Sequence, residues 1–94
     1  MRIISQNGKY DIPYEHYRLS VKEYGSSFDI VAIREECGVL LGEYSTEDKA
    51  KRVLEYIRVH YELSPINSFY LMPTEESVPT DEEMKKLVDK LINS

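Results

Sequence analysis

The sequence predicts an α+β fold, an antiparallel sheet of about five to six strands with a central amphipathic helix and a C-terminal helix. Residues 2–44 divide into short apolar or alternating segments bounded by turn residues, which is typical of strands. Residues 45–63 repeat apolar positions with helical period, and the segment after Pro79 does so again. Because no strand–helix–strand repeat occurs, neighbouring strands are expected to pair antiparallel.

The first strands are predicted at residues 2–6 and 9–12, because Asn7-Gly8 between them favours a two-residue type I′ turn. Residues 18–24 alternate apolar and polar side chains, so one face of that strand should be wet. Residues 28–33 are apolar at nearly every position and are predicted to form a central strand covered on both faces. Strands at residues 39–44 and 67–72 complete the sheet.

Residues 45–63 carry the end signals of a helix as well as its period. Ser45 is the predicted N-cap, acidic residues fill the first turn where the helix dipole favours negative charge, and Pro65 ends the segment. At about 100° per residue, five side chains fall in one sector and should face the core. They are Ala50, Val53, Leu54, Ile57 and Tyr61.

A third sector of this helix is apolar as well, although a helix that packs on one sheet is polar there. The C-terminal segment has its own apolar stripe, and Thr80 and Glu83 before it have the spacing of a capping box. The two apolar surfaces are predicted to meet, within one chain or across a homodimer, and we expect the homodimer. The candidate interface comprises Tyr56, Val59, His60, Leu63, Met84, Leu87, Val88 and Leu91.

The chain is predicted to have an α+β core at residues 1–73, followed by an acidic linker and the C-terminal helix at residues 74–94. The formal net charge is −5, and residues 73–83 hold five acids and no base. Without a basic patch, direct nucleic-acid binding is not expected. Cys37 is the single cysteine and no signal peptide or long apolar run is present, so we expect a cytoplasmic protein with no membrane contact.

The residue pattern contains no catalytic constellation, and no enzyme activity, cofactor or metal is expected. Cys37 lies in an acidic turn, where neighbouring carboxylates would raise the pKa of a thiol and weaken it as a nucleophile. His16 and His60 belong to no spaced metal-binding pattern, and His60 is expected to be a half-buried packing residue. Glycine-rich phosphate loops are absent.

One cluster of polar and aromatic residues follows Pro13. Tyr14, His16 and Tyr17, with Glu15 among them, are predicted to form a corner between two strands. Such a corner is either a well-packed structural element or a contact site for a small molecule or a peptide. These three residues are the candidate ligand site.

Three stretches resemble a group of small uncharacterised proteins of Firmicutes and their phages. They are residues 3–8 (IISQNG) running into 11–15 (DIPYE), residues 41–50 (LGEYSTEDKA) leading into Val53-Leu54, and residues 69–73 (FYLMP). These motifs are structural, and the group brings no established activity. Residues 11–57, with an Ile-Pro-Tyr strand start, a meander and a closing helix, are also similar to bacterial pleckstrin-homology-like domains.

Three functions follow as expectations. The first is a non-enzymatic module that binds a protein partner or itself, encoded by a phage or another mobile element. The second is a phage counter-defence inhibitor whose acidic segment occupies a basic groove on a host protein. The third is a small-ligand binder at the corner formed by Tyr14, His16 and Tyr17, which requires a concave pocket.

Overall fold

The computed structural model describes residues 1–63 and 68–92, without the side chains of Asp81, Leu87, Leu91 and Ile92. One sheet comprises β1 (Arg2–Ile4), β2 (Asp11–Pro13) and β6 (Phe69–Leu71) in the order β2-β1-β6. The other comprises β3 (Arg18–Tyr24), β4 (Ser27–Arg34) and β5 (Cys37–Tyr44) in the order β3-β4-β5. The helices are α1 (Glu47–Leu63) and α2 (Asp81–Ile92).

The fold is therefore α+β, as predicted, but a single antiparallel sheet is wrong. Two three-stranded sheets take its place, and β1 pairs with β6 in parallel. Every antiparallel pair joins strands that follow one another in the chain: β1 with β2, β3 with β4, and β4 with β5. The parallel pair joins the two ends of the core, so no local pattern signals it.

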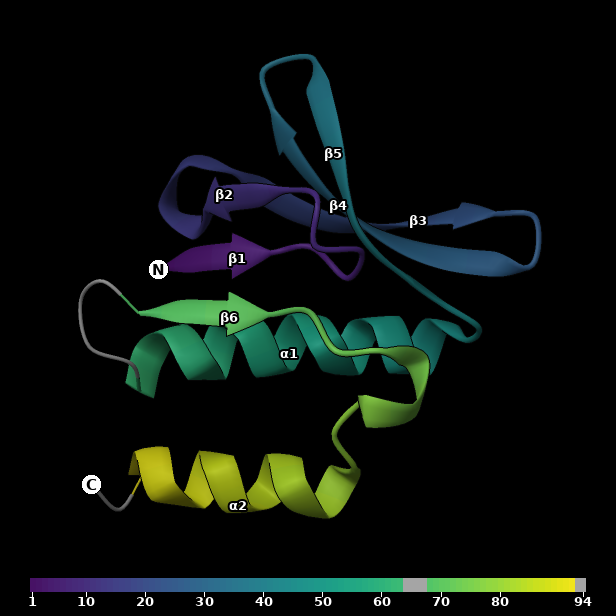
Figure 1. Cartoon of the computed structure of the whole chain (residues 1–94). Helices are drawn as coiled ribbons and strands as arrows, with labels where there is room; N and C mark the ends of the chain where they lie inside the picture. Colours follow the sequence, from purple (N-terminus) through teal and green to yellow (C-terminus); the bar gives the residue numbers. More distant parts are fainter. Residues whose placement is uncertain (64–67, 93–94) are drawn as a thin grey trace.

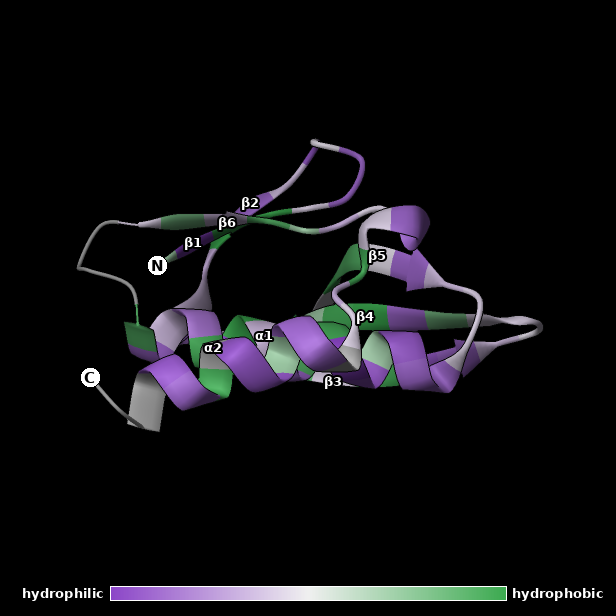
Figure 2. Cartoon of the chain, turned by 90° about the horizontal axis from the view of Figure 1, so that it is seen from below, coloured by the Kyte–Doolittle hydropathy of each residue, from purple (hydrophilic) through white to green (hydrophobic). Residues whose placement is uncertain are grey.

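The two helices lie on one side of the sheets. In Figure 1, α1 passes below β6 and the second sheet, and α2 runs beside α1 on the side away from the strands. Figure 2 shows that β4 is hydrophobic where it passes α1, whereas hydrophilic and hydrophobic residues alternate toward the tip of the β3–β4 hairpin. The core accordingly lies between α1 and the two sheets.

The buried core joins one face of α1 to both sheets. Ala50, Val53 and Ile57 are at most 1% exposed, and Ile30 and Ala32 of β4 are fully buried against them. β4 is central, as predicted, but its opposite face is only half-buried at Val31 and Ile33. The prediction of cover on both faces is therefore only partly met.

The C-terminal end of the predicted helix stripe differs from expectation. Leu54 is half-buried, and Tyr61 is 40% exposed rather than part of the core. Tyr61 contacts Tyr14 instead, with 4.8 Å between their ring centroids. The last turns of α1 thus face the corner after β2.

The third sector of α1 is covered at least in part within one chain. Val59 is 7% exposed, and Tyr56, His60 and Leu63 are half-buried. The His60 ring lies 5.1 Å from that of Tyr70 on β6. On α2, Met84 and Val88 are half-buried, whereas the side chains of Leu87 and Leu91 are outside the described part of the chain. The homodimer stays a prediction.

The start of α1 corrects the predicted cap. Thr46 Oγ1 accepts a hydrogen bond from the backbone N–H of Lys49 at 3.2 Å, so Thr46 rather than Ser45 is the N-cap. Ser45 instead bonds Glu75 through its backbone N–H and its hydroxyl. The capping box of α2 is confirmed, because the Glu83 N–H donates to Thr80 Oγ1 at 3.2 Å.

The first hairpin keeps the predicted register but not the predicted turn. Ile3 pairs with Ile12, as a two-residue Asn-Gly turn would require. A type I′ turn needs a positive φ at both central residues, yet only Gly8 (75°) has one in this turn. Gly8 N–H donates to Ser5 O, and Gln6 N–H donates to Leu41 O at 2.7 Å. Gln6 is thereby drawn out of the hairpin toward β5, which lengthens the loop.

Candidate functional site

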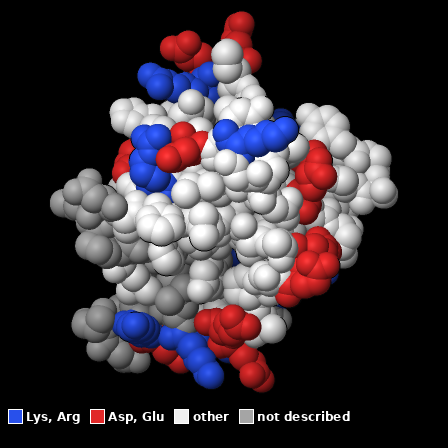
Figure 3. Space-filling model, in the orientation of Figure 1, with Lys and Arg blue, Asp and Glu red and all other residues white. Residues whose placement is uncertain are grey.

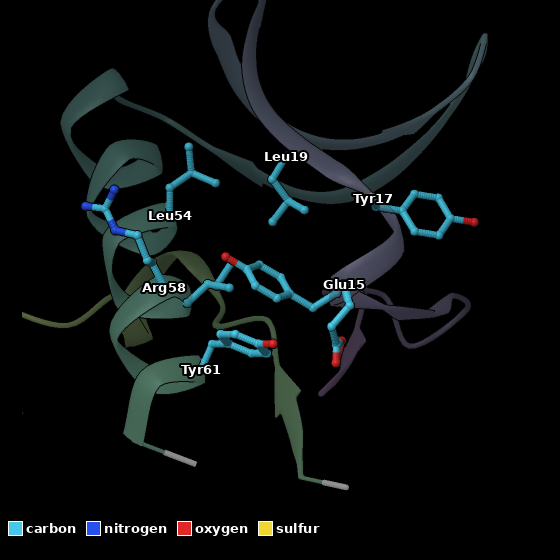
Figure 4. A pocket seen from close by; sticks show the side chains of 8 residues that line it. Glu15, Tyr17, Leu19, Leu54, Arg58 and Tyr61 are labelled. Carbon is cyan, nitrogen blue, oxygen red and sulfur yellow. The ribbon is translucent and has the colours of Figure 1, made fainter. Parts of the chain in front are cut away.

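A pocket of about 500 Å³ lies between α1 and the corner that joins β2 to β3 (Figure 4). It joins two segments that are distant in the sequence. Its lining residues are Tyr14, Glu15, Tyr17, Leu19, Leu54, Ile57, Arg58 and Tyr61.

Pro13 ends β2 and thereby positions the side of the pocket that the corner forms. Proline has no N–H to continue the ladder, so β2 ends there and a single 3-10 turn at Tyr14–His16 redirects the chain into β3. Tyr14 N–H donates to Met1 O at 2.9 Å, which anchors the turn to the start of β1. The turn thereby places Tyr14 and Glu15 beside Leu19 of β3.

The helix side comes from one face of α1. Leu54, Ile57, Arg58 and Tyr61 are spaced at three, four and seven residues, so they share a face of the helix. Figure 4 shows Leu54 and Leu19 facing each other across the pocket, with Arg58 and Tyr61 on the helix side. Apolar side chains therefore form the walls, and polar atoms lie at the rim.

Two tyrosines meet across the pocket. The rings of Tyr14 and Tyr61 lie 4.8 Å apart with 45° between their planes, a tilted aromatic contact. Burial raises the pKa of Tyr14, and the charge of Arg58 opposes that shift. The Tyr14 hydroxyl therefore stays protonated at neutral pH, as a hydrogen-bond donor and acceptor.

The charged groups at the rim already have partners. The Glu15 carboxylate accepts hydrogen bonds from the Met1 amino group at 2.6 and 3.0 Å, and these bonds lower the pKa of Glu15. Arg58 donates through Nη2 to Glu55, and this bond raises the pKa of Arg58. Within the described residues, no nucleophile with an adjacent base lines the pocket. The pocket thus combines apolar walls with a polar rim whose charged groups are already engaged.

The structure brings together only part of the predicted ligand corner. Tyr14 and Tyr17 line the pocket, whereas His16 is exposed and does not. The side chain of Tyr17 points away from α1 (Figure 4). The sequence does not predict Arg58 and Tyr61 as pocket residues. A tyrosine at the end of an apolar stripe is nevertheless a signal of a partly solvent-exposed position.

The acidic segment is partly engaged within the chain. Glu75 accepts hydrogen bonds from Ser45, and its Oε1 lies 2.7 Å from Lys49 Nζ. Glu83 is held by the capping box of α2. Two of the five acids expected to face a basic partner are thus used to attach the linker and to cap a helix.

A further exposed apolar pair lies on β6, outside the residues singled out from the sequence. Phe69 and Leu71 are each 60% exposed, on the face opposite the buried Tyr70. Figure 3 shows acidic and basic side chains around the margin of the face viewed there, while its centre is uncharged. That face carries no continuous basic patch.

Comparisons of the chain with protein-family models, with curated proteins and with solved structures find no match. Among the described residues, neither helix combines the length and the hydropathy needed to cross a membrane. No three His, Cys, Asp or Glu side chains gather there as metal ligands would.

Proposed function

We propose that this chain is a non-enzymatic protein-interaction module, and that the pocket between α1 and the Tyr14 corner receives a side chain of the partner. The observation that carries the proposal is the contact between the rings of Tyr14 and Tyr61. The same pocket is lined by three apolar side chains, Leu19, Leu54 and Ile57. Tyrosine supplies apolar area and a hydroxyl at a low entropy cost, and it is enriched at interfaces for that reason.

A protein partner fits this pocket better than an isolated small molecule. Sites for small molecules usually bury most of the ligand surface. Here the rim is wet, because Tyr61 is 40% exposed and Glu15 and Arg58 are exposed as well. If the side chain that enters the pocket belongs to a protein, the protein surface around it would cover the exposed rim and bury the side chain fully.

Selection from a displayed library of random peptides tests the proposal. Peptides enriched on the wild-type protein should bind Tyr61→Ala at least about tenfold more weakly, the factor that about 1.4 kcal/mol produces. Tyr10→Ala is the matched control, because Tyr10 is 46% exposed in the loop between β1 and β2 and lies outside the pocket. Binding to this variant should match the wild type.

The proposal fails if no peptide is enriched, or if enriched peptides bind Tyr61→Ala as well as they bind the wild type. Circular dichroism of each variant confirms that the fold is retained. Loss of binding in both tyrosine variants would indicate a different surface.

A further inference from the structure

The outer edge of β3 has free backbone groups beside this pocket. Tyr24 and Ser27 flank the two-residue turn of the β3–β4 hairpin, and such a closing pair exchanges hydrogen bonds. The alternation of an antiparallel ladder then directs the N–H and C=O groups of Leu19, Val21 and Glu23 away from β4. Within the described part of the chain, these groups have no other hydrogen-bond partner.

The side chains of the same three residues point toward α1. Their cross-strand partners are Ala32, Ile30 and Phe28, and the first two are fully buried beneath α1. The edge of β3 and the side of α1 therefore form a seam. A strand paired with this edge would present every second side chain to α1.

Two pockets lie along this seam. The pocket of about 500 Å³ lies at Leu19, and a second one of about 300 Å³ is lined by Val21, Glu23 and Phe28 together with Glu47 and Lys51 of α1. Leu19 and Glu23 are four residues apart, roughly 13 Å along a strand at about 3.3 Å per residue. Side chains of one extended segment would reach both hollows.

The other face of β3 carries two cations, and the buried Asp29 of β4 lies opposite one of them. Arg18 and Lys22 are exposed there, on either side of Ser20, and make no ion pair within the described residues. Two copies paired through β3 would place four such cations on one face, and like charges on neighbouring strands destabilise the pairing. A segment with acidic side chains on that face would be attracted instead.

We infer that the partner is an extended peptide segment that adds to the free edge of β3 as an antiparallel strand. A large apolar side chain of the segment enters the pocket at Leu19, and acidic side chains lie opposite Arg18 and Lys22. Main-chain hydrogen bonds supply affinity, and the pocket and the cations supply selectivity. This inference rests on the proposed function of the pocket.

A synthetic probe tests it directly. The probe is a capped seven-residue peptide in which outward glutamates alternate with inward threonines, with one phenylalanine at an inward position. Nuclear magnetic resonance should show its binding to the intact chain, and amide exchange at Leu19, Val21 and Glu23 should slow at least about tenfold. The amides of Ser20 and Lys22, which already face β4, should not change.

Two control probes separate the contributions of backbone and charge. N-methyl groups on the inward residues remove the ladder donors and should abolish binding. Lysines in place of the glutamates should weaken binding at least about tenfold.

A double variant, Arg18→Glu with Lys22→Glu, should reverse the preference between the glutamate and lysine probes. Lys9→Glu with Arg34→Glu is the matched control, since both cations are exposed and lie off β3. This control should retain the preference of the wild type, and circular dichroism verifies that both variants fold.

The result distinguishes the two proposals. If the glutamate probe shifts the resonances of Leu54 and Tyr61 without slowing exchange at the three edge amides, the strand-addition inference is wrong while the pocket proposal survives. Absence of binding at about 1 mM probe would overturn the inference. Equal binding of the N-methylated probe would overturn it too, because no ladder would then form.

Discussion

In the sheet of β3, β4 and β5, one residue in each tight turn decides whether the backbone there is strained. Gly25 and Glu35 both follow the closing residue of a two-residue hairpin loop, with φ angles of 58° and 57°. Glycine adopts this left-handed region without steric cost. Glutamate does not, because its Cβ crowds the following carbonyl oxygen at a cost of about 1–2 kcal/mol. The β4–β5 turn is therefore strained where the β3–β4 turn is relaxed.

Replacing Glu35 with glycine should stabilise the protein. We expect Glu35→Gly to raise the free energy of unfolding by about 1 kcal/mol, since strain is removed at an exposed position. Urea titration followed by circular dichroism measures the change. Gly25→Glu is the reverse control and should cost a similar amount. A Glu35→Gly variant less stable than the wild type would show that Glu35 makes a contact that outweighs the strain.

At the scale of elements, one carboxylate attaches the linker to the start of α1. Glu75 accepts hydrogen bonds from Ser45 N–H at 3.1 Å and from the Ser45 hydroxyl, and it pairs with Lys49 Nζ at 2.7 Å. The hydrogen bond from Lys49, and then that from Ser45, lowers the pKa of Glu75 below its ordinary value of 4.5. The 3-10 turn at Glu75–Ser77 is thus held against the helix N-terminus.

This attachment should depend on pH. Because the folded state lowers the pKa of Glu75, its stabilising contribution is present above 4.5 and is lost as the pH falls through the lower folded value. Glu75→Gln should be less stable than the wild type at neutral pH by up to about 1 kcal/mol, as expected for a solvent-screened pair. In acid, the unfolding free energies of Glu75→Gln and the wild type should become equal.

Urea titrations from about pH 7 to about pH 2 follow this convergence. The neighbouring variant Glu76→Gln is the control, since Glu76 is exposed and has no hydrogen-bond or ion-pair partner among the described residues. Its unfolding free energy should stay within about 0.5 kcal/mol of the wild type. A stability difference for Glu75→Gln that does not change with pH would contradict the assignment.

At the scale of the whole molecule, the side chain of Gln6 joins the two sheets. Its amide nitrogen donates to Pro73 O at 3.1 Å, just beyond β6, and its amide oxygen accepts from Glu43 N–H on β5 at 3.0 Å. Tyr44 of β5 adds a second link, because its hydroxyl donates to Pro73 O at 2.8 Å. Polar side chains thus connect sheets that share no ladder.

Removing the Gln6 amide should loosen this junction. Gln6→Ala removes the side-chain acceptor of the exposed Glu43 N–H and should lower the free energy of unfolding by about 0.5–1.5 kcal/mol. Lys9→Ala, at an exposed position of the same loop, should change it by less than about 0.5 kcal/mol. Amide exchange at Glu43 should accelerate only in the first variant. Unchanged exchange there would mean that the sheets are held by other contacts.

The elements were largely predictable because their signals are local. Alternation and turn residues predicted the β3–β4–β5 meander, and the Asn7-Gly8 pair predicted the register of Ile3 with Ile12 although the turn itself is longer. Thr80 and Glu83 predicted the cap of α2. At the pocket, the sequence indicates the corner residues Tyr14 and Tyr17 because they lie close together after Pro13.

Local patterns are sufficient to predict the fold class, the helical face that holds Ala50, Val53 and Ile57, and most element boundaries, because each depends on neighbours within a few residues. The parallel pairing of β6 with β1 and the contact of Tyr61 with Tyr14 become visible only in the folded chain. These contacts join segments far apart in the chain. Their free energy comes from surfaces that become adjacent only after folding, so no local pattern encodes them.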